Sequence, residues 1–101
     1  MSVTRHLSSD GKELTISIHG KFDFGVVHEF RRAYSSLGDE KPVVYIDLRN
    51  TEYLDSSALG MLLNMRKAII NQVESVAIIN TNPQVKSILE ISRFDKLFKI
   101  E

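Results

Sequence analysis

The stretch Leu54-Asp55-Ser56-Ser57-Ala58-Leu59-Gly60 places one carboxylate and two hydroxyls where a strand gives way to a helix. The apolar run Val43–Leu48 precedes it and is typical of a strand that is covered on both faces. Apolar residues at helical spacing follow it: Leu59, Leu62, Leu63, Ile69 and Ile70. Asp55 or Ser56 is therefore the expected N-cap. Because one cap would suffice, three polar residues beside free amide donors also favour a place for a phosphate group.

The segments on either side alternate between strand and helix patterns. The periodicity predicts strands at 3–7, 13–19 and 76–79, and helices over 24–37 and from Pro83 onward. Gly38 is expected just beyond the end of the first of these helices. The alternation predicts one α/β domain over residues 1–101. Its mixed sheet of four to five strands would be covered by three to four helices.

Composition excludes several classes of function. Thirteen basic and thirteen acidic residues cancel, and no run of like charge favours nucleic acid or an anionic membrane as a partner. The absence of cysteine rules out disulfides and thiolate metal sites. The first ten residues do not form a signal peptide, and no apolar stretch is long enough to span a membrane. We therefore expect a cytoplasmic protein, and a monomer because no long exposed apolar stripe is evident.

Four groups of residues occur in a distinctive order: Gly20-Lys21-Phe22-Asp23, Ile46-Asp47-Leu48, Tyr53–Gly60, and the late segment from Asn82-Pro83 to Leu97–Ile100. This ordered set resembles the signature of STAS domains, and most of all that of the single-domain bacterial anti-sigma factor antagonists. Gly20–Asp23 resembles the turn that this family has between its second strand and first helix. The resemblance covers the chain from about Leu7 to Ile100.

The resemblance implies a non-enzymatic switch without a cofactor. In that family the serine directly after the aspartate accepts a phosphate, and this serine corresponds to Ser56. The unphosphorylated form would bind an anti-sigma factor that carries a serine kinase domain. Phosphorylation of Ser56 would release that partner, and a metal-dependent serine phosphatase would reverse the modification. The residues implied for the partner-binding face are Asp23, Asp55, Ser56, Ser57 and Leu59.

Local chemistry offers a structural explanation for several of these residues. Ser57 is expected in the first helical turn, bonded locally, which favours Ser56 as the phosphate acceptor. Asp23 is expected to cap the helix that follows it. A glycine inside a helix costs about 1 kcal/mol relative to alanine, and close approach of helix to sheet would explain Gly60. Met61 and Met65 are expected in the core.

Two other functions remain open. A constitutive scaffold or subunit, for example of a transport complex, would use Ser56 only as a helix cap. A small hydrolase would need a base near Ser56, but no Gly-x-Ser-x-Gly motif occurs and no histidine follows this serine. Asp23 and Asp55 could pair as carboxylates if their loops converge. The dispersed His6, His19 and His28 predict no metal site. We expect no enzymatic activity.

Overall fold

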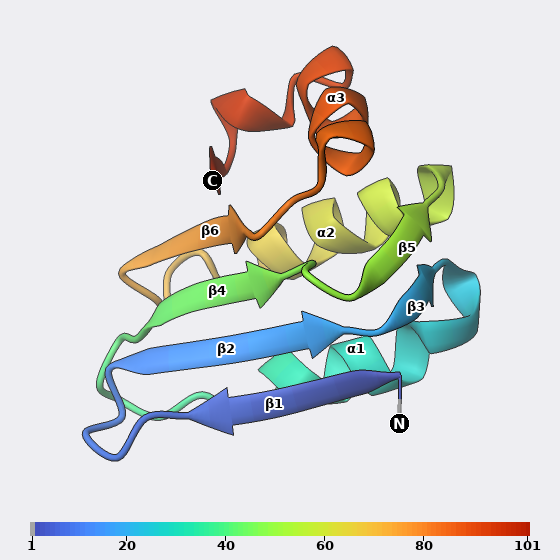
Figure 1. Cartoon of the computed structure of the whole chain (residues 1–101). Coiled ribbons are helices and arrows are strands. Elements are labelled where there is room, and N and C mark those ends of the chain that lie inside the picture. The colour runs from blue at the N-terminus through green and yellow to red at the C-terminus, as the bar shows by residue number, and fades with distance from the viewer. Residues whose placement is uncertain (1) are drawn as a thin grey trace.

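The computed structural model describes residues 2–101, which form a five-stranded sheet, a separate two-stranded sheet and three α-helices (Figure 1). The strands of the larger sheet lie in the order β1-β2-β4-β6-β7, and only β1 and β2 run antiparallel. Their bounds are β1 Val3–Leu7, β2 Glu13–Ile18, β4 Val43–Asp47, β6 Ser75–Ile79 and β7 Lys99–Ile100. The predicted mixed α/β fold is confirmed.

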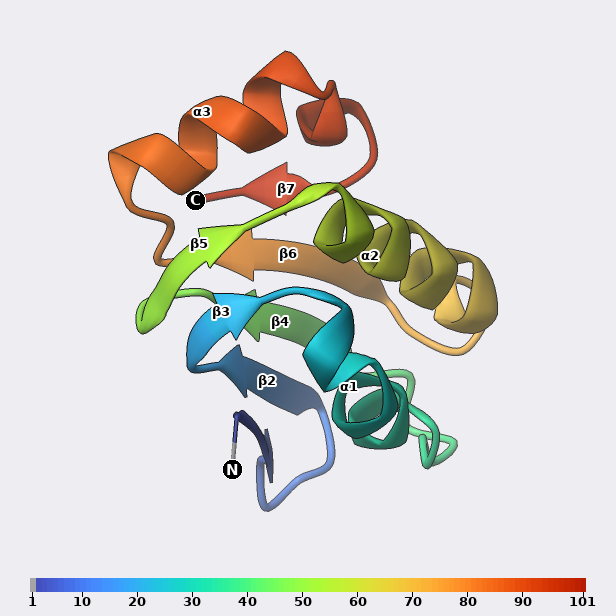
Figure 2. The same cartoon turned by 90° about the vertical axis from the view of Figure 1, so that its right-hand side faces the viewer.

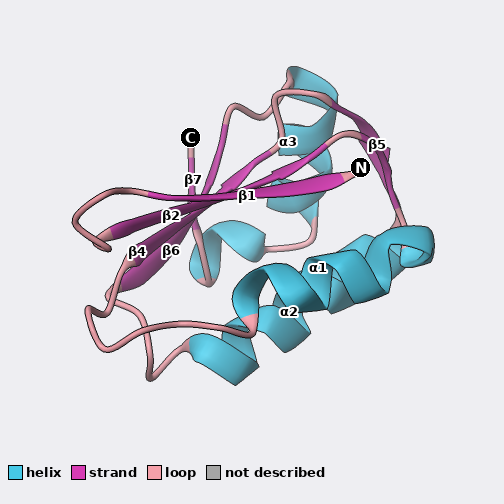
Figure 3. Ribbon diagram, turned by 90° about the horizontal axis from the view of Figure 1, so that it is seen from below, coloured by secondary structure: helices cyan, strands magenta, loops and turns pink. Residues whose placement is uncertain are grey.

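Alternate residues of β2 and β4 supply the centre of the core. Leu14, Ile16 and Ile18 are fully buried in β2, and Val44 and Ile46 are fully buried in β4. Burying such a side chain contributes about 1.5–3 kcal/mol relative to leaving it in water. The helices α1 (Val27–Tyr34) and α2 (Ser56–Ile69) lie together on this face of the sheet (Figure 3).

The opposite face of the sheet is less covered. Thr15 and Tyr45 alternate with the core residues and are only half-buried. The prediction that the strand at Val43–Leu48 is covered on both faces was therefore wrong. The apolar run is nearly continuous in sequence, but only alternate residues of β4, Val44 and Ile46, are fully buried.

The two-stranded sheet pairs β3 (Gly20–Phe22) in parallel with β5 (Thr51–Leu54). Gly20–Asp23 lies between β2 and the first helix, as the family resemblance implied, but its first three residues form the strand β3 instead of a turn. The strand that leads into α2 is β5 and not the buried β4. Gly20 is the first residue of β3 and has a φ of 82°, a backbone conformation that residues other than glycine rarely adopt. It thus allows the chain to turn sharply between β2 and β3. Thr51 Oγ1 donates to the Ile18 carbonyl at 2.9 Å and ties β5 to the end of β2.

The first helix is shorter than predicted. A 3₁₀ helix, η1 (Phe24–Val26), precedes α1, and α1 ends at Tyr34 rather than near Gly38. Ser35 ends it, since its amide and hydroxyl both donate to the Arg32 carbonyl, at 3.4 and 3.1 Å. The predicted role of Gly38 was therefore wrong.

The other helices agree with the sequence patterns except at Gly60. Asn82 caps α3 (Pro83–Ile91), with Pro83 in its first turn, and a 3₁₀ helix, η2 (Phe94–Lys96), follows. Met61 and Met65 are buried in the core as predicted. The interpretation of Gly60 as a point of close helix–sheet approach was wrong, because a Cβ atom there would meet nothing within 4 Å.

Candidate functional site

The paired strands β3 and β5 each lead through an aspartate into a helix at one end of the molecule (Figure 2). We call these transitions the Asp23 junction (residues 22–26) and the Asp55 junction (residues 54–58). In the sheet register Phe22 lies opposite Leu54, and the Asp55 amide makes a long hydrogen bond of 3.4 Å to the Phe22 carbonyl. The pairing of two short strands thus brings both predicted site aspartates to one place.

Asp55, one of the two residues predicted for this role, is the N-cap of α2. Its Oδ1 accepts a hydrogen bond from the Ala58 amide at 3.1 Å and a second from Ser57 Oγ at 2.6 Å. These bonds, that from Ser57 most of all, hold the pKa of the Asp55 carboxyl below its ordinary value of 3.8. A hydrogen bond to the charged form of an acid favours that form. The Asp55 junction therefore carries a fixed negative charge at neutral pH.

The two serines of the Asp55 junction differ in what their hydroxyls do. Ser57 is half-buried, and its hydroxyl is already used in the bond to Asp55, as the prediction of local bonding required. Ser56 is exposed, and within residues 2–101 its hydroxyl has no hydrogen-bond partner. Both sit in the first turn of a helix, where backbone amides and the helix dipole favour an added negative charge. Only Ser56 presents a free, reachable hydroxyl there.

The Asp23 junction has the same plan with different details. Asp23 Oδ1 accepts from the Gly25 amide at 2.9 Å and so caps η1, which confirms its predicted capping role. Phe24 follows it and is 67% exposed. Sequence reasoning treated Phe24 only as an opening helix residue. It lies three residues before Val27 and so fits the apolar spacing of the helix, which means that nothing in the sequence indicated that it faces solvent.

Leu59 stands apart from the other predicted partner-binding residues. It lies on α2 one turn after Ser56, and its half-buried side chain packs against the core. Tyr53, which sequence reasoning did not include, is 39% exposed on β5 beside the Asp55 junction. The structure therefore groups Asp23, Asp55, Ser56 and Ser57 at one end, with exposed aromatic side chains next to them.

Residues 2–101 contain no group of three His, Cys, Asp or Glu side chains that could hold a metal ion. None of the helices in this range is long and apolar enough to cross a membrane. The site thus consists of two capped helix starts, the carboxylates of Asp23 and Asp55, the Ser57 hydroxyl bonded to Asp55, and the free Ser56 hydroxyl.

A family model described as the STAS domain matches residues 4–101. The chain belongs to the STAS domain family. A STAS-domain containing protein of Pseudomonas aeruginosa is 47% identical to it over 100 residues, which cover 99% of each chain. An anti-sigma F factor antagonist of Paenibacillus polymyxa is 32% identical over 57 residues, 56% of this chain and 49% of the relative. The family resemblance inferred from the residues is confirmed.

Solved structures of STAS-like proteins share the fold. The anti-sigma factor antagonist SpoIIAA in its unphosphorylated form matches with a TM-score of 0.71 at 13% identity, over 98% of this chain and 86% of that one. A sulfate transporter family protein from Wolinella succinogenes matches with a TM-score of 0.73 at 14% identity, over 88% and 77% of the two chains. At these identities the likeness shows the fold alone. The same architecture thus occurs in a regulator and in a transporter family protein.

Proposed function

We propose that this STAS domain is a cytoplasmic, non-enzymatic partner-switching regulator controlled by phosphorylation of Ser56. Its unphosphorylated form binds an anti-sigma factor with serine kinase activity, which transfers a phosphate to Ser56 and then dissociates. A metal-dependent serine phosphatase restores the binding form. The observation that carries the proposal is the exposed, unbonded hydroxyl of Ser56 beside a neighbouring serine whose hydroxyl is already committed to Asp55.

The charge of a phosphate explains how such a switch leaves the domain folded. Phosphorylation adds roughly −1.5 to −2 charges at neutral pH. The start of α2 favours an anion by about 0.3–1 kcal/mol, which offsets repulsion from the ionised Asp55 next to it. Neither cap has to break, because the Ser56 hydroxyl takes part in no bond within the described chain.

The same charge acts differently against a docked partner. A surface that fits a neutral serine must desolvate the new anion, and any acidic partner group nearby adds repulsion. Like charges placed together at an interface cost on the order of several kcal/mol, and each ~1.4 kcal/mol is a tenfold change in affinity. Asp23 and Asp55 already make this end acidic, so the phosphate adds to a negative charge that the docked partner has to accommodate.

The proposed partners follow from relatives rather than from geometry. A relative named as an anti-sigma F factor antagonist supports an anti-sigma factor as the partner. A fold neighbour described as the unphosphorylated form of an anti-sigma factor antagonist supports control by phosphorylation. Against a hydrolase, no histidine forms a hydrogen bond with Ser56 among residues 2–101, and the His19 ring instead lies within hydrogen-bond distance of Thr4 Oγ1. The fold match to a sulfate transporter family protein favours the scaffold as the second candidate.

A pull-down from lysate of the source cells separates the two candidates. The baits are the wild-type domain, Ser56→Ala and Ser56→Asp, with Ser75→Asp as a control that adds the same charge at an exposed position on β6. The switch predicts that a kinase-type regulator binds wild type, Ser56→Ala and Ser75→Asp but not Ser56→Asp. If all four baits capture the same proteins, Ser56 is no switch and the scaffold function takes its place.

A further inference from the structure

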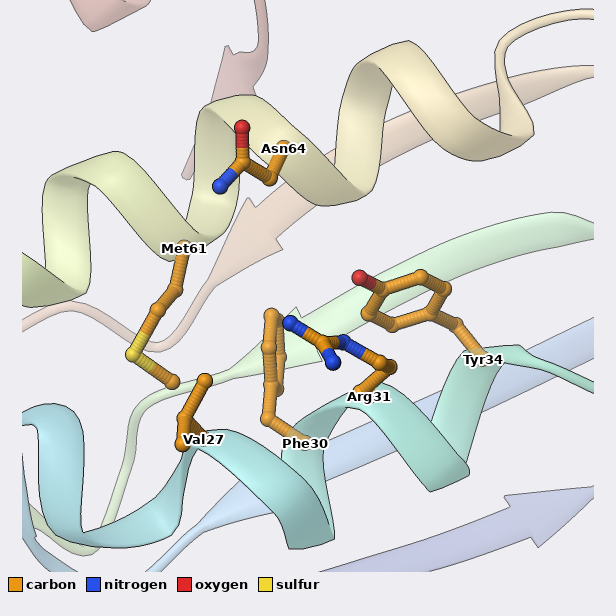
Figure 4. A pocket seen from close by; sticks show the side chains of 6 residues that line it. All are labelled: Val27, Phe30, Arg31, Tyr34, Met61 and Asn64. Atoms are coloured by element: carbon orange, nitrogen blue, oxygen red, sulfur yellow. The ribbon is translucent and has the colours of Figure 1, made fainter.

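A shallow groove runs between α1 and α2, starting at the two junctions. On α1 it is lined by Val27, Arg31 and Tyr34, and on α2 by Met61 and Asn64 (Figure 4). The α1 residues are spaced by four and then three positions, so they form one stripe along the helix. Val27 directly follows the Asp23 junction, and Met61 lies three residues after the Asp55 junction. The groove therefore begins beside the two junctions and extends for about 10 Å along α1, from Val27 to Tyr34.

The groove has an apolar floor with a small opening. Phe30 is almost completely buried beneath it, and the hollow has a volume of about 20 Å³. That is about the space of one water molecule or one methyl group. Figure 4 shows Arg31 and Tyr34 pointing from α1 toward α2, while Met61 reaches from α2 toward Val27.

Cationic side chains border this floor. An open depression of about 400 Å³ adjoins the hollow through Arg31 and is lined by His28, Arg31, Arg32 and Ser35. No acidic residue lines either space in the part of the chain that the structure describes. In that same range the one salt bridge joins Lys99 and Glu101, so Arg31 and Arg32 have no carboxylate partner. The groove is basic, whereas the junctions at its start carry Asp23 and Asp55.

We propose that this groove, which we call the interhelix groove, is a second contact surface for the regulator and receives an acidic amphipathic helix of that partner. The inference rests on the proposed function for the identity of the partner, since the groove begins beside the two junctions. One small aliphatic side chain of the partner helix enters the hollow, and flanking carboxylates meet Arg31 and Arg32.

Three features favour an acidic helix as the occupant. Two neighbouring helices leave a groove into which the side-chain ridge of a third helix fits. Arginine pairs with carboxylates through two parallel hydrogen bonds, so the contact has a fixed orientation in addition to its charge attraction. The cations also flank an apolar floor instead of forming a broad basic field, and this arrangement suits a helix with both apolar and acidic residues better than a nucleic-acid backbone.

The test is an NMR titration of the ¹⁵N-labelled domain with two synthetic helical peptides. Both carry a single stripe of leucine and alanine, flanked by glutamate in one and by glutamine in the other. We expect the glutamate peptide to shift the amide resonances of residues 27–35 and 57–68, and to bind about tenfold more tightly than the glutamine peptide at low salt. Arg31→Gln should weaken the glutamate peptide about tenfold.

Lys67→Gln is the matched control, because Lys67 is an exposed cation on α2 that lines neither space. It should weaken the peptide less than twofold. Equal losses in Arg31→Gln and Lys67→Gln, or shifts outside the groove, would overturn the proposal. So would a short DNA duplex or anionic phospholipid vesicles that produce the same shifts at the same charge concentration, because the groove would then be an unselective anion surface.

A separate arm distinguishes failure of the groove from failure of the switch. Ser56→Asp should leave the affinity for the glutamate peptide within about twofold, since the peptide contacts the groove and not the serine. For the regulator captured by the wild-type domain, Arg31→Gln should weaken binding about tenfold while Ser56→Ala leaves it unchanged. A regulator that binds Arg31→Gln as tightly as wild type contradicts the groove while the switch stands.

Discussion

The Asp23 and Asp55 junctions share one arrangement, and their differences favour the Asp55 junction as the place of the proposed switch. Each places an aspartate cap after a short strand, and the two strands are paired. The Asp55 junction opens directly into the long helix α2 and presents a free serine. The Asp23 junction opens into a 3₁₀ turn and presents an exposed phenylalanine. One junction thus presents a free hydroxyl and the other an exposed apolar side chain beside it.

The largest expected effect comes from breaking the pairing that holds the junctions together. Phe22 is fully buried at the end of β3 and packs against Phe30, with ring centroids 5.4 Å apart. Phe22→Ala should lower the free energy of unfolding by about 3–5 kcal/mol, measured by urea denaturation. Phe24→Ala, only two residues away, is the control and should change it by less than about 0.5 kcal/mol. Similar losses in both variants would contradict the placement of these side chains.

The next effect concerns partner binding at the Asp23 junction. If Phe24 is the apolar contact, Phe24→Ala should weaken the regulator about tenfold or more while leaving the fold intact. Isothermal titration with the captured regulator measures this change. Ile91→Ala is the matched control, because Ile91 is 78% exposed on α3 and should be neutral. An unchanged affinity in Phe24→Ala would restrict the interface to the Asp55 junction.

The two caps should differ in their contribution to stability. Asp55 starts a 14-residue α-helix and orders Ser57, whereas Asp23 starts a single 3₁₀ turn. Asp55→Ala should therefore lower the midpoint of thermal unfolding by about 4–8 °C, and Asp23→Ala by less than half of that. Calorimetry on both variants checks the difference. A larger loss of the unfolding midpoint in Asp23→Ala than in Asp55→Ala would contradict the assignment of Asp55 as the more important cap.

The smallest effect is on the titration of Asp55. Because Ser57 is the first cause of its lowered pKa, Ser57→Ala should raise that pKa toward 3.8. A carboxyl whose pKa is lowered by folding stabilises the fold above its unfolded pKa, and this contribution is lost as pH falls through the folded pKa. The wild type should therefore lose stability on acidification below about pH 4 more steeply than Ser57→Ala. NMR titration of the Asp55 carboxyl follows the pKa directly, and an identical value in both proteins would contradict the role of Ser57.

Local chemistry made much of the site predictable from the sequence. The bonding of Ser57 and the start of α3 at Pro83 depend on neighbouring residues and were predicted correctly, and the cap of α2 was narrowed to Asp55 or Ser56. The buried face of β2 was equally clear from strict alternation of apolar residues. Each of these features can be predicted from a few consecutive residues.

Features that depend on distant contacts were missed. The strands β3 and β5 have three and four residues, too few for a period to appear, and they exist because they pair with each other. The end of α1 was placed too late because Ser35, a weak signal in the sequence, completes the last turn. The exposure of Phe24 could not be foreseen either, since an aromatic residue beside a cap is ordinarily assigned to the core.

The most direct measurement is the site of phosphorylation in the native protein. Intact-mass analysis and peptide mapping of the domain purified from its source cells would locate the modification, and a binding assay would compare the two forms. We expect a single phosphate on Ser56, present only in the fraction that no longer binds the regulator. A native protein without phosphate, or one phosphorylated on Ser57 with Ser56 unmodified, would contradict the proposed switch at Ser56.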